Sequence, residues 1–400
     1  MYILVIGCSD VGYHLTKALL ASRHEVMVVE KSHTRYELLR EELGSVAFQG
    51  DGTDPLVLEK AGVNRADVLI ATTPENFTYT TSVVSWSQRL TGRLAMAILP
   101  KQGDPAILVA EQERTYVLEQ SWIQDVKPYV AMGSSPITSL SDLLNEMGLG
   151  AGRIGVEISS FQTGVYQELI SALPEAELID CGPIFKSLRE VKTEAEVELL
   201  RSGAIATERA LMATYTTIRP GDRERSIVGR LAGNMVQNGA DLPGFLFLTT
   251  GANTGHAHPS PSEHLVQIGD LVKSDCGAYF SGYLSDIART GVVGIPSSAQ
   301  KVLYEQLYGV HRRTLESIGP GVPANEVFRV ASQAYQEADI PFPFSFAGHG
   351  IGLSVHEGPI LSAQDSTPLA PNMVFSVETR IRQPGWGYHI EDMLRITDSG

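Results

Sequence analysis

The chain has 400 residues, more than one ordinary domain needs, so two or three domains are expected. Hydrophobic residues make up 43% and charged residues 19%, a composition that supplies real cores and excludes wholesale disorder. The formal net charge of -15, which no basic stripe offsets, argues against nucleic acid and anionic membrane as main partners.

The cysteines are few and odd in number: Cys8, Cys181 and Cys276. Their spacing gives neither a disulfide framework nor a zinc-type motif, so we expect a reducing, cytoplasmic location. No apolar run has the length needed to cross a bilayer. No internal repeat and no low-complexity segment are evident in the sequence.

The first 73 residues alternate strand and helix patterns. Such a βαβ rhythm predicts a parallel sheet with crossover helices, as in a Rossmann-like half-domain. The predicted strands are residues 2–6, 25–30, 46–49 and 68–72, and the predicted helices are residues 11–21, 34–43 and 56–61.

A glycine fingerprint lies between the first strand and the first helix. Gly7, Ser9 and Gly12 take its three positions, with serine in the middle one. Glu30 ends the second strand about twenty residues on, where an acid can bind ribose hydroxyls. Together with Asp51 after the third strand, this segment resembles the nucleotide-binding domain that regulates potassium transporters. The resemblance implies NAD(H) or an adenine nucleotide as ligand; the alternative is a structural half-domain that binds nothing.

Residues 76–182 read as further α/β material without a cluster of histidines or acids at ligand spacing. They resemble the non-catalytic domain of prolidases, and this resemblance implies a role in substrate access and assembly. The strand at 68–72 fits the domain before it and the domain after it, and we place the boundaries at 1–75, 76–182 and 183–400. The pattern predicts strands over 94–99, 106–109 and 153–157 and helices over 139–147 and 165–173.

A predicted hairpin over residues 275–286 carries two aspartates. Its aromatic residues favour strands, and its Ser-Gly pair favours a turn. With the turn centred on Phe280-Ser281, Asp275 and Asp286 would face each other with Cβ atoms roughly 5 Å apart. Like charges at that range destabilise a sheet unless a proton or a cation lies between them. The alternative is a hairpin with two solvated aspartates.

Histidines and acids recur downstream beside glycines and apolar residues. Seven of the ten histidines follow residue 250, which places the chemistry in the carboxyl-terminal half. Four carboxylates and one imidazole meeting at one point would suit two divalent cations such as Mn²⁺, Co²⁺, Fe²⁺ or Zn²⁺. The residues of this set are Asp275, Asp286, His349, Glu378 and Glu391.

The order of these motifs is specific. An Asp, ten residues, a second Asp, then Gly-His-Gly-Ile-Gly-Leu at 348–353 with His356-Glu357 and two separated glutamates resembles the pita-bread metallopeptidases. These are prolidase, aminopeptidase P and methionine aminopeptidase, with creatinase as a non-metal relative. The resemblance implies an α+β pita-bread catalytic domain, preceded by an α/β Rossmann-like half and an α/β middle domain. It also implies a homodimer, and a closing strand and helix that would follow Gly400.

The resemblance gives each residue of the set a role. Asp275 corresponds to the chelating ligand of the first metal, and Asp286 and Glu391 correspond to the bridging pair. His349 and Glu378 correspond to the remaining ligands of the second metal. Two such cations lower the pKa of a shared water and prepare it to attack the first peptide bond.

Three residues resemble the catalytic groups of this family. Glu378 corresponds to the residue that accepts a water proton and passes it to the leaving nitrogen. His258 and His356 correspond to the donors that stabilise the carbonyl and the developing oxyanion. Without the resemblance, a single loop histidine such as His258 is more often simply exposed.

Two positions depart from the family pattern. His389 stands two residues before the last glutamate, where prolidase and aminopeptidase P usually carry an arginine, so a permanently charged fork is missing. Thr379 follows Glu378 where a proline is usual.

The sequence therefore predicts a dinuclear metal-dependent exopeptidase that removes the N-terminal residue of a peptide substrate, above all at Xaa-Pro bonds. Two alternatives stay open. One is a hydrolase of a small non-peptide C–N bond on the same site. The other is a nucleotide-sensing or binding module with a silent peptidase fold.

Overall fold

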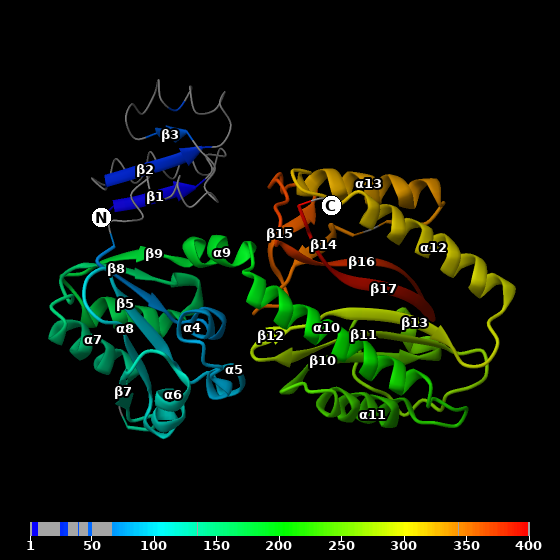
Figure 1. Ribbon diagram of the computed structural model, residues 1–400, viewed down its shortest axis with the longest axis horizontal. Coiled ribbons are helices and arrows are strands. Elements are labelled where there is room, and N and C mark those ends of the chain that lie inside the picture. Colours follow the sequence, from blue (N-terminus) through cyan, green and yellow to red (C-terminus); the bar gives the residue numbers. More distant parts are fainter. Residues whose placement is uncertain are drawn as a thin grey trace. The chain divides into compact units, whose positions relative to one another are not determined.

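The computed structural model describes residues 2–6, 25–30, 39, 47–49, 66–133, 135–342 and 344–398. The chain divides into two compact units, 1–188 and 189–400, which are described separately (Figure 1). Within the described ranges, every helix is too short or too polar to cross a membrane.

The first three strands form a parallel sheet in the order β1-β2-β3, with β1 at Tyr2–Ile6, β2 at Glu25–Glu30 and β3 at Ala47–Gln49. Parallel neighbours need crossover connections, as the βαβ rhythm of the sequence predicts. For Glu30 the structure gives its position at the end of β2. The predicted helices over 11–21, 34–43 and 56–61, and the fingerprint residues Gly7, Ser9, Gly12 and Asp51, lie outside the described residues.

A second sheet in the first unit has six strands in the order β7-β6-β5-β4-β8-β9 and mixes parallel with antiparallel pairs. Its strands are β4 (Val68–Ala71), β5 (Met96–Pro100), β6 (Ala106–Ala110), β7 (Asp125–Tyr129), β8 (Arg153–Val156) and β9 (Glu177–Asp180). Among its described residues, this unit has the helices α4 (Pro74–Thr81), α5 (Trp86–Thr91), α6 (Arg114–Gln120), α7 (Pro136–Glu146), α8 (Thr163–Ala172) and α9 (Gly182–Glu190), the last of which runs into the second unit.

Strand β4 belongs to the second sheet, so of the two domains that residues 68–72 fit, the structure pairs them with the strands that follow. It pairs antiparallel with β5 and parallel with β8. Val68, Ile70 and Ala71 are buried, and such a continuous apolar run favours a strand with neighbours on both sides.

The residues after β4 form helix α4. Thr73 caps the helix by accepting a hydrogen bond from the Asn76 amide, and Pro74 occupies the first helical position. Both features are typical helix starts because the first amides of a helix have no partner within it.

The second unit is built on one antiparallel sheet in the order β10-β11-β13-β17-β16-β14-β15, with β12 paired to β11. Its strands are β10 (Leu242–Thr250), β11 (Leu271–Phe280), β12 (Tyr283–Leu284), β13 (Ile287–Val292), β14 (Phe346–Gly350), β15 (Glu357–Ser362), β16 (Val374–Gln383) and β17 (Trp386–Arg395). Its helices are α10 (Glu194–Tyr215), α11 (Glu224–Gln237), α12 (Ser298–Glu316) and α13 (Ala324–Glu337).

Two helix pairs cover the two halves of this sheet, as Figure 1 shows. Helices α10 and α11 pack on β10, β11 and β13 through a core that includes Leu211, Leu231 and Cys276. Helices α12 and α13 pack on the other half through cores that include Val327 and Tyr335. Because the helices take one face of the strands, the opposite face is left to line a cavity.

The two halves repeat one arrangement, which the sequence analysis did not detect. Residues 218–221 and 318–321 both read Ile-x-Pro-Gly, and each run leads into the second helix of its pair. Gly221 and Gly321 both have positive φ, at 92° and 81°. Each glycine amide donates to a distant backbone carbonyl, of Val266 and of Leu369 respectively. The expectation of no internal repeat is therefore wrong. The repeat was missed because this motif keeps just three identical residues, Ile, Pro and Gly.

Candidate metal centre and substrate cavity

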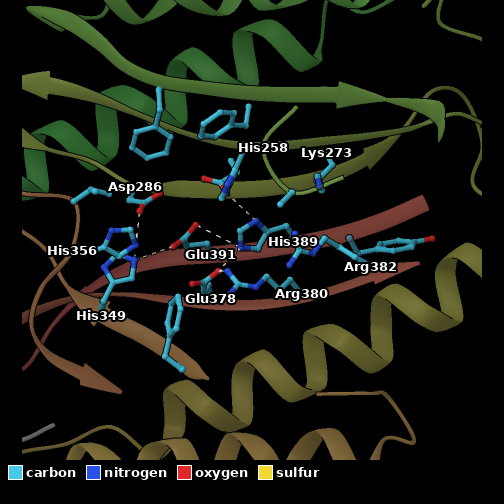
Figure 2. A pocket seen from close by; sticks show the side chains of 17 residues that line it. His258, Lys273, Asp286, His349, His356, Glu378, Arg380, Arg382, His389 and Glu391 are labelled. Carbon is cyan, nitrogen blue, oxygen red and sulfur yellow. Dashed lines mark hydrogen bonds and ion pairs between the residues drawn. The ribbon is translucent and has the colours of Figure 1, made fainter. Parts of the chain in front are cut away.

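The predicted chemical residues line one cavity of about 560 Å³ in the second unit (Figure 2). Strands β16 and β17 supply much of its floor. Glu378 pairs with Glu391 across this ladder, and Arg380 pairs with His389 one step further along the same face. Side chains two residues apart on a strand share a face, so this ladder presents a carboxylate pair beside a pair of nitrogen bases.

The hairpin holds its two aspartates on one face but not directly opposite each other. Its turn is centred on Ser281-Gly282, both with positive φ, so Asp275 pairs with Ala288. The register predicted with a turn at Phe280-Ser281 is therefore wrong by two residues. An even shift keeps both side chains on the same face and makes them diagonal neighbours.

Both aspartates are buried, which contradicts the alternative of two solvated carboxylates. Asp275 is 9% exposed and Asp286 is 4% exposed. One carboxylate oxygen of Asp286, Oδ1, is buried without a hydrogen-bond partner. A buried charge without a partner is costly, so this oxygen needs a proton or a cation.

His349 presents a bare ring nitrogen to two carboxylates. Its Nδ1 lies 3.1 Å from the Gly350 carbonyl, which can only accept, so Nδ1 carries the proton. Its Nε2 faces Asp286 Oδ2 at 3.7 Å and Glu391 Oε1 at 4.0 Å. Burial lowers the pKa of His349 to about 4, so the ring is neutral at pH 7. Three electron-pair donors that converge in this way are complementary to a cation.

His389 forms a second arrangement of the same kind. Its Nε2 donates to Glu378 Oε2 at 3.1 Å, which leaves Nδ1 facing Asp275 Oδ2 at 3.6 Å. Burial lowers the pKa of His389 to about 3, so this imidazole is also neutral. Asp275, His389 and Glu391 each offer an atom within 4.8 Å of the others, as do Asp286, His349 and Glu391. Glu391 belongs to both groups.

The pKa values of the carboxylates at the centre are shifted because these groups are buried and because they repel one another when charged. Burial, and then the charge of Asp275, raises the pKa of Asp286 well above its usual value. Burial, and then the charges of Asp286 and Asp275, does the same to the pKa of Glu391. Burial alone would raise the pKa of Asp275, but the hydrogen bond from His258 and nearby positive charges hold it below the usual value.

The donor set fits two divalent cations. An orphaned Asp286 oxygen, two bare imidazole nitrogens and a carboxylate shared by both groups are what a pair of oxygen- and nitrogen-seeking ions requires. The predicted ligand Glu378 lies outside both groups. Its Oε2 accepts from His389 and also forms a close ion pair with Arg380.

The two further predicted histidines lie at the sides of the cavity. His258 places Nε2 3.4 Å from Asp275 Oδ2 and packs its ring 4.5 Å from that of Phe247. His356 is exposed, and its ring lies 4.3 Å from that of His349. Both point into the same space in Figure 2, so the structure brings all the predicted catalytic residues together.

Four lining residues were not predicted as functional. His389 was recognised only as a departure from a family pattern, although it faces three carboxylates. Lys273, Arg380 and Arg382 also line the cavity. A signal was present in the alternation of the strands, because Lys273 lies two residues from Asp275, and Arg380 and Arg382 lie two and four residues from Glu378.

Comparison with known proteins agrees with this geometry. Metallopeptidase family M24 matches residues 198–398, and the TrkA-N domain matches residues 3–113. The chain is 31% identical over 343 residues to the uncharacterized peptidase YqhT of Bacillus subtilis, covering 84% of this chain and 92% of that protein. It is 33% identical over 254 residues to an Xaa-Pro dipeptidase of Pyrococcus horikoshii, covering 63% of this chain and 72% of that protein.

Solved structures give the same result. The prolidase from Pyrococcus horikoshii superposes with a TM-score of 0.75 at 28% identity, covering 86% of this chain and 94% of that chain. The prolidase from Pyrococcus furiosus gives a TM-score of 0.73 at 26% identity, covering 86% and 97%.

Proposed function

Because the chain belongs to metallopeptidase family M24, we propose that it is a dinuclear metal-dependent exopeptidase that hydrolyses the first bond of short peptides, preferentially Xaa-Pro bonds. Relatives named Xaa-Pro dipeptidase and prolidase support this substrate class. The observation that carries the proposal is the meeting of Asp275, Asp286, His349 and Glu391 inside one cavity.

The ligands are the five residues of the predicted set, with His389 as a further donor. Glu391 belongs to both groups of candidate donors, and Glu378 would be a ligand in place of its ion pair with Arg380. Divalent ions bound here would polarise the substrate carbonyl and make water a stronger nucleophile at neutral pH. The residues of the predicted set that would hold these ions are Asp275, Asp286, His349, Glu378 and Glu391.

The remaining steps fall to side chains of the chain itself. Glu378 accepts a proton from water on Oε2 and returns it to the leaving nitrogen. His389 holds that carboxylate through Nε2. His258 and His356 lie where they can donate to the substrate carbonyl oxygen as negative charge develops on it.

Metal analysis and a defined peptide panel test this proposal. Dialysed protein should retain close to two transition-metal ions per chain, and it should cleave Xaa-Pro dipeptides with Mn²⁺ or Co²⁺. Glu378→Ala should abolish turnover while leaving the fold intact, and Glu391→Gln should in addition lose bound metal. Glu305→Gln, which removes an exposed glutamate of α12, is the matched control.

Peptides that stay intact while cyclic or amide compounds are cleaved would favour the alternative of a non-peptide C–N hydrolase. A protein that binds no metal and cleaves neither class would favour the silent peptidase fold. Undiminished turnover by Glu378→Ala would refute the role given to that residue.

A nucleotide site in the first unit is a second candidate function, supported by the TrkA-N match and by the parallel β1-β2-β3 sheet. The proposed ligand is NAD(H) or an adenine nucleotide, held by Gly7, Ser9, Gly12, Glu30 and Asp51. A rise in melting temperature with NADH or ATP is expected, and no shift at millimolar ligand would support a structural domain. The homodimer and the cytoplasmic location also stay predictions, which light scattering and cell fractionation can test.

A further inference from the structure

The cavity has a cationic side beside its carboxylate centre. Lys273 on β11 and Arg380 and Arg382 on β16 line it. Figure 2 shows Lys273 and Arg382 on the side of His389 away from His349 and His356, and Arg380 reaching toward Glu378. They run from the interior to the mouth, since Lys273 is buried, Arg380 half-buried and Arg382 exposed.

These cations have few partners of opposite charge. In the part of the chain that the structure describes, no carboxylate forms an ion pair with Lys273 or Arg382. The Lys273 ammonium donates to the His256 carbonyl, which satisfies one of its three hydrogens. The Nε of Arg380 is buried without a partner.

The three cations also disfavour one another. Their side chains line one cavity, so like charges lie near one another there. The one carboxylate that pairs with Arg380 is Glu378, which the proposed function assigns to the metals. Four carboxylates neutralised by two divalent ions would leave three positive charges in the cavity.

The spacing fits an anion carried by a short peptide. Along β16, Arg380 and Arg382 follow Glu378 at about 7 Å and about 14 Å, taking a rise of about 3.4 Å per residue. The guanidinium of Arg380 also packs over the rings of Phe344 and Phe346, at 4.4 Å and 5.2 Å from the ring centroids, which fixes its position. Carboxylates on the residues that flank a bond held near Glu378 fall within reach of these side chains.

We propose that Lys273, Arg380 and Arg382 form an anion subsite that makes acidic peptides, with a carboxylate side chain beside the cleaved bond in addition to the terminal carboxylate, the preferred substrates. This inference rests on the proposed peptidase function. One terminal carboxylate neutralises a single charge of the three, so a second carboxylate gains a charge-assisted hydrogen bond that its neutral isostere lacks.

Matched peptide pairs test the subsite. Glu-Pro and Gln-Pro differ by one charge at equal size, as do Ala-Glu and Ala-Gln, and Gln-Pro amide lacks the terminal carboxylate. Their Kd values are measured by calorimetry on the Mn²⁺-loaded Glu378→Ala variant, where no turnover is expected, and kcat/KM is measured on the wild type with Mn²⁺. We expect the acidic member of at least one pair to bind about tenfold more tightly.

Arg382→Gln should reduce the ratio of Kd values between the amide and the acidic peptide of a pair to less than about threefold, whereas Arg382→Lys should keep most of that ratio. Arg312→Gln removes an equal charge from an exposed position on α12 and should leave the discrimination unchanged. Acidic binding should also weaken as salt is raised.

The subsite is overturned if both acidic peptides bind no better than their amide isosteres, including the case in which only the terminal carboxylate matters. It is also overturned if Arg382→Gln prefers the acidic peptides over their amide isosteres as strongly as the wild type does. Hydrolysis of Gln-Pro without acidic preference would leave the peptidase function standing. Acidic preference in calorimetry without hydrolysis of any peptide would instead count against the peptidase function alone.

Discussion

Arg380 and His389 face each other across the β16–β17 ladder, each two residues from a glutamate of the candidate metal centre. The guanidinium that this family usually carries on the strand of the last glutamate is missing at position 389. A guanidinium is nevertheless present, because it projects from the partner strand at position 380 and pairs with Glu378. The neutral His389 ring fits beside it without like-charge repulsion.

Restoring the usual arginine should therefore harm this protein. His389→Arg would place two guanidinium groups directly opposite each other, an arrangement that destabilises a sheet pair. We expect kcat/KM on Xaa-Pro dipeptides to fall at least about tenfold. The exchanged double variant Arg380→His/His389→Arg should recover part of that loss, which would appear as non-additivity in a double-mutant cycle. Equal or higher activity of the single variant would contradict this interpretation.

His311 of α12 links the strands behind the centre. Its Nε2 donates to Asp392 Oδ2 at 2.9 Å, so Nδ1 accepts from the Thr379 hydroxyl at 3.0 Å. Thr379 and Asp392 each follow a glutamate of the candidate centre, Glu378 and Glu391. The hydroxyl at position 379, where the family usually has proline, is therefore the partner of a buried imidazole.

Thr379→Val tests this link at nearly constant volume. The variant leaves His311 Nδ1 buried and unpaired, so the free energy of unfolding should fall by about 1–3 kcal/mol. Urea denaturation measures the loss. In the His311→Leu background the same substitution should cost much less, because no imidazole is left unsatisfied. An equal cost in both backgrounds would show that the hydrogen bond is not responsible.

The repeated Ile-x-Pro-Gly turn offers a matched pair of glycines. Gly321 has φ of 81°, a conformation that a side chain disfavours, whereas Gly319 has no positive φ and open space where a Cβ would stand. Gly321→Ala should destabilise the protein by about 1 kcal/mol, while Gly319→Ala should be neutral or slightly stabilising. Melting temperatures of the two variants decide the matter, and equal shifts would exclude backbone strain as the cause.

Sequence patterns predict the centre better than its surroundings. The convergence of Asp275 and Asp286 could be predicted because both lie on one hairpin. Side chains alternate between the two faces of a strand, so any even change of register leaves both aspartates on the same face. The register of the two strands could not be predicted, since it depends on which two residues form the turn. Arg380 was missed because its role depends on which residue faces it across β16 and β17, and nothing in the local sequence gives that pairing. The sheet to which β4 belongs could not be predicted, because a short apolar run fits either of two sheets.

The buried carboxylates should make the metal-free protein sensitive to pH in a defined direction. Burial, and then the charge of Asp275, raises the pKa of Asp286 well above its value of about 4 in an unfolded chain. The folded state therefore binds the proton more tightly, and the stability that this gives is fully present below pH 4 or so. It is lost as pH rises toward the pKa of the folded state.

Asp286→Asn removes this titration. The difference in free energy of unfolding between the variant and wild type should therefore grow in favour of the variant from pH 5 to pH 8 when metal is chelated. Urea denaturation in EDTA at three pH values measures it, and Asp398→Asn, at an exposed position, serves as control. Added Mn²⁺ should reverse the order, because ligand binding to the folded state stabilises wild type more than a variant that lacks a ligand. A difference that stays constant with pH, or Mn²⁺ stabilisation equal in both proteins, would exclude Asp286 from the centre.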